Sequence, residues 1–127
     1  MTTAIAAECK KVLFVDDEPI ICRFSTKVLS IEGYQVDTAQ NGLIARDMAE
    51  AQPYDVCVTD IRTPQMNGIQ LYDHFMKNNP SLAEKTIFIT GDIISEDVAE
   101  FIKAKSPTVL VKPFSPQDLV CAVRNKL

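Results

Sequence analysis

The stretch VLFVDDEP, residues 12–19, is a continuous apolar run that ends directly in acidic residues. An apolar run without polar alternation is typical of a strand in a parallel sheet that is covered on both faces. Four more short runs rich in Val, Ile and Phe follow it, at residues 34–38, 56–59, 86–90 and 108–111. We therefore predict five strands in a parallel sheet.

Amphipathic segments separate these runs, at residues 19–31, 42–50, 68–77 and 96–104, and a fifth begins with the capping-box-like sequence SPQD at residues 115–118. The first segment is predicted to bury one helical face, formed by Ile21, Phe24, Val28 and Ile31. Gly33 marks the end of this helix, and Ser95 is a good N-cap for the fourth. Five strands that alternate strictly with five helices predict a doubly wound α/β fold with right-handed crossovers.

The composition describes one globular domain. The chain has 127 residues, of which 46% are hydrophobic and 24% charged, and its formal net charge is -4. An acidic balance argues against direct binding of nucleic acid, which needs a basic face. No stretch approaches the ~18 apolar residues of a membrane span, and the N-terminus does not have the pattern of a signal peptide. We predict a lead-in at residues 1–10 and one domain at 11–127, without membrane insertion.

The four cysteines predict a reduced, cytoplasmic protein rather than a metal site. They occupy positions 9, 22, 57 and 121, none forms a CxxC pair, and the chain has a single histidine. Cys22, Cys57 and Cys121 lie in apolar stretches, so we expect them to be buried thiols.

Chemically active side chains follow four of the five predicted strands. Asp16, Asp17 and Glu18 follow the first, Asp60 the third, Thr90 the fourth and Lys112 the fifth. In a doubly wound sheet the functional groups gather beyond the carboxyl ends of the strands. We therefore expect carboxylates, a hydroxyl and an ammonium group to meet at one edge.

This set of groups predicts phosphoryl chemistry. Clustered carboxylates repel one another unless a cation joins them, and oxygen ligands of this kind suit Mg²⁺. A strand-end lysine and threonine can then contact phosphoryl oxygens, and an aspartate can act as the nucleophile. Taken singly, each residue has an ordinary explanation, since an aspartate can cap a helix and a lysine can be a solvated surface residue. Their coincidence at matching strand ends favours a site.

The chain resembles the receiver domain of two-component response regulators over residues 11 to 127. The segments that carry the resemblance are VLFVDDEP at 12–19, VTDIRTPQMNG at 58–68, ITG at 89–91 and VKPF at 111–114. The resemblance implies a flavodoxin-like (βα)5 three-layer sandwich with strand order 2-1-3-4-5.

The resemblance also implies a role for each site residue. Asp60 is the expected phosphoacceptor, with Thr90 and Lys112 as its catalytic partners. Asp17, Asp60 and the backbone carbonyl of Arg62 are expected to hold Mg²⁺, and Asp16 to join through water. The bond between Lys112 and Pro113 is expected to be cis.

Two departures from the family pattern, at Thr63 and Val109, affect what can be carried over. Thr63 stands where the family usually has Met, which is tolerable because the turn at residues 66–68 is intact. Val109 stands where the family often has an aromatic residue that rotates as the threonine moves, so the signal is expected to travel by loop and helix shifts. Arg62 and Asp92 occupy positions that tune the lifetime of the phosphoryl group in the family. The segment 90–92 and the fifth strand resemble receivers attached to hybrid sensor histidine kinases.

The resemblance implies a partner histidine kinase or phosphotransfer protein and a downstream output protein or domain. It implies that the isolated domain is not an enzyme, although it catalyses its own phosphorylation and slow dephosphorylation. A degenerate receiver that only binds proteins is the main alternative. A Mg²⁺-dependent phosphatase would have Asp-x-Asp after the first strand, and a nucleotide or flavin binder would have a Gly- or Ser/Thr-rich loop there.

Two groups of residues outside the site have open or ordinary roles. The single histidine, His74, is expected to be a surface residue of a short helix. Phe101, Ile102 and Val109 are either core residues or an apolar patch on an output face, and the sequence leaves both open.

Overall fold

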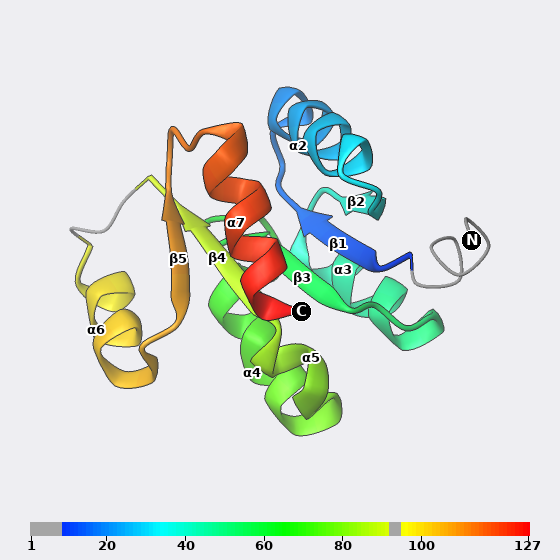
Figure 1. Ribbon diagram of the computed structural model, residues 1–127. Helices are drawn as coiled ribbons and strands as arrows, with labels where there is room; N and C mark the ends of the chain where they lie inside the picture. Colours follow the sequence, from blue (N-terminus) through cyan, green and yellow to red (C-terminus); the bar gives the residue numbers. More distant parts are fainter. Residues whose placement is uncertain (1–8, 92–94) are drawn as a thin grey trace.

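The computed structural model describes residues 9–91 and 95–127, and it contains a five-stranded parallel sheet of order β2-β1-β3-β4-β5 (Figure 1). The strands are β1 (Lys11–Val15), β2 (Gln35–Ala39), β3 (Val56–Asp60), β4 (Thr86–Thr90) and β5 (Thr108–Val111). The predicted fold class and strand order are therefore confirmed. Asp92 and residues 1–8 of the predicted lead-in lie outside the described residues.

The described residues contain six helices, one more than the sequence predicted. They are α2 (Pro19–Ile31), α3 (Gly42–Ala51), α4 (Gly68–Asn78), α5 (Pro80–Glu84), α6 (Glu96–Lys105) and α7 (Pro116–Lys126). The additional helix is α5, whose five residues are too few to show a helical period. Asn79 ends α4 and also caps α5, where its side chain accepts a hydrogen bond from Leu82 N–H.

Helices cover both faces of the sheet, with α7 on its near side and α3 on its far side in Figure 1. The side chains of β1 alternate between the two layers: Val12 and Phe14 pack in the core beneath α2 and α7, whereas Leu13 and Val15 pack against α3 and α4. Burial on both faces explains why the strand is continuously apolar in sequence. None of the helices in the described ranges has both the length and the apolar character needed to cross a membrane.

The helix boundaries follow the local signals that the sequence contains. Gly33 has φ +96°, and Tyr34 N–H donates to Leu29 O, which is the pattern of a Schellman C-cap. Ser115 and Asp118 form the predicted capping box. Ser95 is the N-cap of α6 as predicted, but its hydroxyl makes no capping hydrogen bond; it contacts Asp97 and Arg62 instead.

The predicted buried face of α2 is wrong in part. The buried side chains are Cys22, Ser25 and Leu29, whereas Phe24 is exposed and Ile31 is 74% exposed. Ile21 and Val28 are only partly buried against this core. The helix packs against β1, β2 and α7, and its side chains at positions 22 and 29 enter the core that these elements share. Which face of a helix is buried therefore depends on the elements that pack against it, not only on the number of apolar residues on that face.

Of the three cysteines predicted to be buried, two are buried in the structure. Cys22 and Cys57 are buried, but Cys121 is exposed because it lies on the outer face of α7. All four cysteines are free thiols. Burial raises the pKa of Cys22 to about 11, so this thiol is protonated at neutral pH.

One buried hydroxyl in α2 gives a stability prediction. Ser25 is fully buried, and its Oγ has no hydrogen-bond partner among the described residues. Because an unsatisfied buried polar atom is destabilising, Ser25→Ala is expected to raise the free energy of unfolding by about 1 kcal/mol more than Ser30→Ala does. Ser30 is exposed on the same helix and controls for helix propensity. Urea unfolding of both variants measures the difference, and equal stabilities would contradict the prediction.

Candidate functional site

The predicted site residues occupy the carboxyl-terminal edge of the sheet. Asp16 directly follows β1, Asp60 and Thr90 end β3 and β4, and Lys112 directly follows β5. The strand register brings these ends level, since Val15 pairs with Thr59, and Asp60 with Ile89. The structure therefore brings together at this edge side chains that are up to 96 positions apart, from Asp16 to Lys112.

The ammonium group of Lys112 lies among three carboxylates. Its Nζ donates to Asp60 Oδ2 at 2.8 Å and to Glu18 Oε1 at 2.6 Å. Asp16 Oδ2 lies 3.2 Å from the same Nζ, as an ion pair without the alignment of a hydrogen bond. Burial works to lower the pKa of Lys112, but the bonds to Asp60 and Glu18 outweigh it and raise that pKa above its usual range. Lys112 is therefore charged at all physiological pH values.

Glu18 is a site residue to which the sequence analysis gave no role. It is the N-cap residue of α2, and its side chain makes no capping hydrogen bond there. Its carboxylate instead reaches Lys112 across 94 positions of sequence. The signal in the sequence was its place in the acidic run after β1, but the acidic run alone gave no partner for it.

The environment of Asp16 disfavours the ionised form of its carboxyl group. Its side chain is fully buried, and Oδ1 accepts a hydrogen bond from Glu18 N–H at 2.9 Å. Its Oδ2 has no hydrogen-bond partner among the described residues. Burial raises the pKa of Asp16 to about 6; the charge of Asp60 adds to this, while the Glu18 hydrogen bond and Lys112 act against it.

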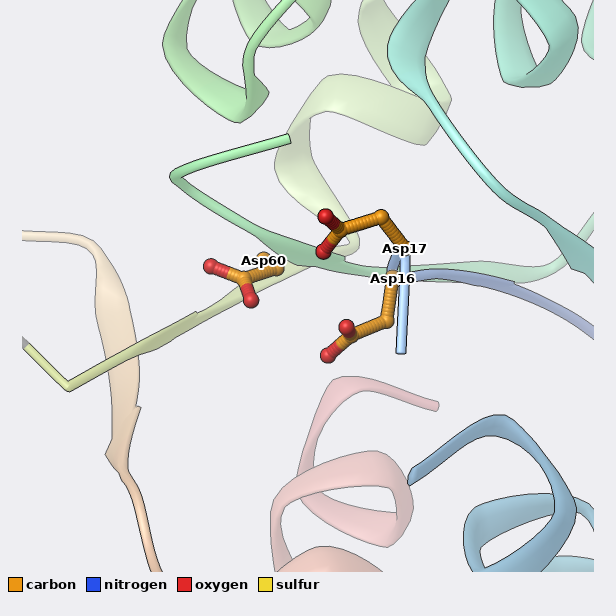
Figure 2. Close-up of side chains that lie close together, drawn as sticks. All are labelled: Asp16, Asp17 and Asp60. Atoms are coloured by element: carbon orange, nitrogen blue, oxygen red, sulfur yellow. The ribbon is translucent and has the colours of Figure 1, made fainter. Parts of the chain in front are cut away.

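Three carboxylates at this edge could hold a metal ion. Figure 2 shows Asp16, Asp17 and Asp60 gathered there, and ligand oxygens of the three lie within 4.8 Å of one another. The buried Oδ2 of Asp16 forms an ion pair with Lys112 but accepts no hydrogen bond from the described residues, so it can still bind a cation, or a water molecule held by one. Hard oxygen ligands of this kind fit a divalent cation such as Mg²⁺.

Three hydrogen bonds hold the loop that follows Asp60. The Oδ1 atom of Asp60 accepts a hydrogen bond from Arg62 N–H at 3.0 Å. Thr63 Oγ1 donates to Met66 O at 2.9 Å, which explains why threonine is accepted at this position. Gly42 N–H, at the start of α3, also donates to Met66 O at 3.0 Å. The turn around the candidate acceptor therefore depends on a neighbouring helix as well as on its own sequence.

The remaining strand ends provide the other side of the site. Thr90 is fully buried at the end of β4, and its backbone carbonyl accepts from Lys112 N–H at 2.9 Å. Next to it, a Cβ added to Gly91 would lie 3.9 Å from Lys112 Cβ, its one close neighbour among residues 9–91 and 95–127. The Lys112–Pro113 bond is cis, as the resemblance implies.

The apolar residues near β5 belong mainly to the core. Phe101 is buried and packs edge-on against Phe88 and Tyr72, with ring centroids 4.9 Å and 5.6 Å away. Ile102 and Val109 are partly buried against the same cluster. His74 is partly buried on α4, and its Nε2 lies 3.1 Å from Glu50 Oε2, so it is a helix-surface residue paired with α3.

Comparison with known proteins gives one consistent result. The family model for the response regulator receiver domain matches residues 12–124. The chain is 32% identical over 118 residues to the response regulator receiver protein CpdR of Brucella abortus, covering 93% of this chain and 97% of that protein. It is also 32% identical to the probable transcriptional regulatory protein TcrX of Mycobacterium tuberculosis, covering 91% of this chain but only 49% of that protein.

Solved structures agree with these sequence matches. A CheY-like receiver domain protein from Methanospirillum hungatei superposes with a TM-score of 0.84 at 28% identity, covering 94% of both chains. The chemotaxis protein CheY4 of Vibrio cholerae gives a TM-score of 0.80 at 30% identity, covering 94% of this chain and 99% of that one.

Proposed function

The chain belongs to the response regulator receiver domains, and from this premise we propose that it is a signalling switch in which Asp60 accepts a phosphoryl group. One observation carries the assignment of Asp60. Asp60 is the last residue of the central strand β3, and its buried carboxylate contacts both the Lys112 ammonium and the Arg62 N–H. It thus lies where positive groups can stabilise the charge of an incoming phosphoryl group.

The proposed donor is the phosphohistidine of a partner protein. A carboxylate oxygen of Asp60 attacks the phosphorus atom, so that an O–P bond forms as the N–P bond of the donor breaks. The electron pair of the broken bond stays on the ring nitrogen, and the donor histidine leaves as a neutral imidazole whose other nitrogen carries the proton. The product is an aspartyl phosphate, an established kind of covalent intermediate.

Each neighbouring residue has a proposed task in this step. Lys112 moves from Asp60 Oδ2 to a phosphoryl oxygen and neutralises it, and Thr90 donates its hydroxyl to another. Asp17, Asp60 and the Arg62 carbonyl would hold Mg²⁺, and Asp16 would join through water. When bound, Mg²⁺ would neutralise part of the charge that the carboxylates share with the phosphoryl oxygens.

The proposed partners are a sensor histidine kinase or phosphotransfer protein and an output domain or protein. This chain spans about half the length of TcrX and nearly all of CpdR. We propose that residues 11–127 act as a receiver in the cytoplasm, alone or within a hybrid sensor kinase, and that the domain has no activity beyond its own phosphorylation and dephosphorylation. The formal charge of -4 supports protein partners rather than direct contact with nucleic acid.

Intact mass tests the proposed function. After incubation with Mg²⁺ and acetyl phosphate, the chain is expected to gain the mass of one phosphoryl group, and Asp60→Asn is expected to gain none. Omitting Mg²⁺ should also suppress the gain, since the carboxylates then repel the donor. A folded native chain that never gains the mass would support the degenerate, partner-binding receiver, and a gain that persists in Asp60→Asn would identify another acceptor.

A further inference from the structure

Besides the ion pairs of Lys112, an ion pair between Arg62 and Asp97 connects the loop after β3 to α6. The Nη1 and Nη2 atoms of Arg62 lie 3.3 Å and 3.1 Å from Asp97 Oδ2 and Oδ1. Arg62 Nη2 also donates to Ser95 Oγ, and the Ser95 hydroxyl donates to Asp97. These three side chains, which we call the Arg62 clamp, join residues 33 to 35 positions apart in the chain.

The clamp has the geometry of a specific contact rather than a chance surface pair. Isolated exposed ion pairs contribute little, but the bidentate fork of an arginine on a carboxylate fixes both direction and distance. The Ser95 hydroxyl makes no capping hydrogen bond at the start of α6 and instead contacts Arg62 and Asp97. The hydrogen bonds from Ser95 and Arg62 lower the pKa of Asp97, so this partner is ionised throughout the neutral range.

The main chain of Arg62, by contrast, contacts the candidate acceptor. The backbone N–H of Arg62, the residue whose side chain holds α6, donates to Asp60 Oδ1 at 3.0 Å. A single residue therefore contacts the acceptor with its main chain and the first turn of α6 with its side chain.

We propose that Asp97 and Ser95 are positioning residues, which act through Arg62 to fix the backbone beside Asp60 and to couple that backbone to α6. The inference rests on the proposed function, in which the Arg62 carbonyl is a Mg²⁺ ligand. Fixing the loop lowers the cost of binding the ion. Because coupling is reciprocal, a change at Asp60 also changes the first turn of α6.

The first test needs no phosphodonor. The test variant is Asp97→Asn, and its control is Glu96→Gln, which removes the same charge from the same helical turn, where Glu96 makes no ion pair within residues 9–91 and 95–127. Mg²⁺ is titrated while the amide signal of Arg62 is followed by NMR. Asp97→Asn is expected to need about two- to fivefold more Mg²⁺ for half-saturation, as expected from losing one surface ion pair, and the control is expected to match the native chain.

A double-mutant cycle and a rescue separate positioning from a general loss of structure. In an Arg62→Gln background, Asp97→Asn is expected to have no further effect on the Mg²⁺ midpoint. Asp97→Glu is expected to recover at least part of the native midpoint, since it can still receive the arginine fork. Equal midpoints for Asp97→Asn and Glu96→Gln, or additive effects in the cycle, would overturn the proposal.

The second test adds acetyl phosphate and follows hydrogen exchange in the first turn of α6. Phosphorylation is expected to change this exchange in the native chain and in Glu96→Gln, and to change it by less than half as much in Asp97→Asn. The phosphorylation rate at saturating Mg²⁺ is expected to be similar in the native chain and in Glu96→Gln, and the exchange of all three chains is compared at equal extents of phosphorylation. An unaltered α6 response in Asp97→Asn would overturn the coupling. A chain that is never phosphorylated would contradict the proposed function, while the Mg²⁺ titration would still decide the positioning role.

Discussion

Replacing Asp16 with asparagine is expected to raise the free energy of unfolding of the metal-free protein at pH 7.5 by roughly 2 kcal/mol. Asp16 is fully buried, and burial raises its pKa from 3.8 to about 6. At pH 7.5 the folded protein therefore has an ionised carboxylate in a site that favours the neutral form. An amide removes that charge and keeps an oxygen for the Glu18 N–H, although it loses the attraction to Lys112, which reduces the gain.

The sign of the pH dependence follows from the raised pKa. The folded state binds a proton at Asp16 more tightly than the unfolded state does, so this residue contributes stability below about pH 4. That contribution is lost as the pH rises through about 6. The advantage of Asp16→Asn over the native chain should accordingly be small at pH 4 and fully developed above pH 7.

Mg²⁺ gives the complementary measurement. A cation bound at this edge offsets the repulsion among the carboxylates, so Mg²⁺ is expected to stabilise the native chain and to stabilise Asp16→Asn less. Urea unfolding at pH 4.5 and 7.5, with and without Mg²⁺, measures all of these effects. Asp73→Asn, at an exposed position on α4, is the control for a change of one charge. If Asp16→Asn were less stable than the native chain at pH 7.5, the inference that the buried charge of Asp16 is destabilising would be contradicted.

Replacing Gly42 with alanine is expected to destabilise the fold by about 3 kcal/mol and to slow phosphorylation at least about tenfold. A Cβ at this position would lie 2.1 Å from Met66 O, and the obstacle is backbone that cannot rotate away. Either α3 or the turn after Asp60 must move, and the hydrogen bond from Gly42 N–H to Met66 O is lost with it. The turn also carries the Arg62 N–H that contacts Asp60.

Gly33 provides the matched control for this substitution. It has φ +96°, but an added Cβ would have no neighbour within 4 Å in the part of the chain that the structure describes. Gly33→Ala is therefore expected to cost about 1 kcal/mol from backbone strain alone. It lies just before β2, at the opposite edge of the sheet from the site, so its phosphorylation rate should stay native. Urea unfolding and intact mass over time measure both properties, and equal stability of the two variants would show that the turn at Met66 yields easily.

The local pattern of the chain is sufficient to predict the order of elements and the position of the site. Apolar runs identified the strands, and β1, β3 and β4 read as continuous runs because they are buried on both faces. The amphipathic segments predicted the bounds of α2, α3, α4 and α6 to within one residue. The carboxyl ends of parallel strands must meet at one edge, so Asp16, Asp60 and Lys112 could be grouped before any coordinates were known.

Only the tertiary structure decided how each element is turned and which distant side chains pair. The buried stripe of α2 depends on where α7 lies, and the exposure of Cys121 depends on which face of α7 meets the sheet. The carboxylate of Glu18 and the guanidinium of Arg62 reach partners 94 and 35 positions away. Periodicity is a property of a single segment, whereas helix rotation and ion pairing depend on the packing of several segments at once, and that packing exists only in the folded chain.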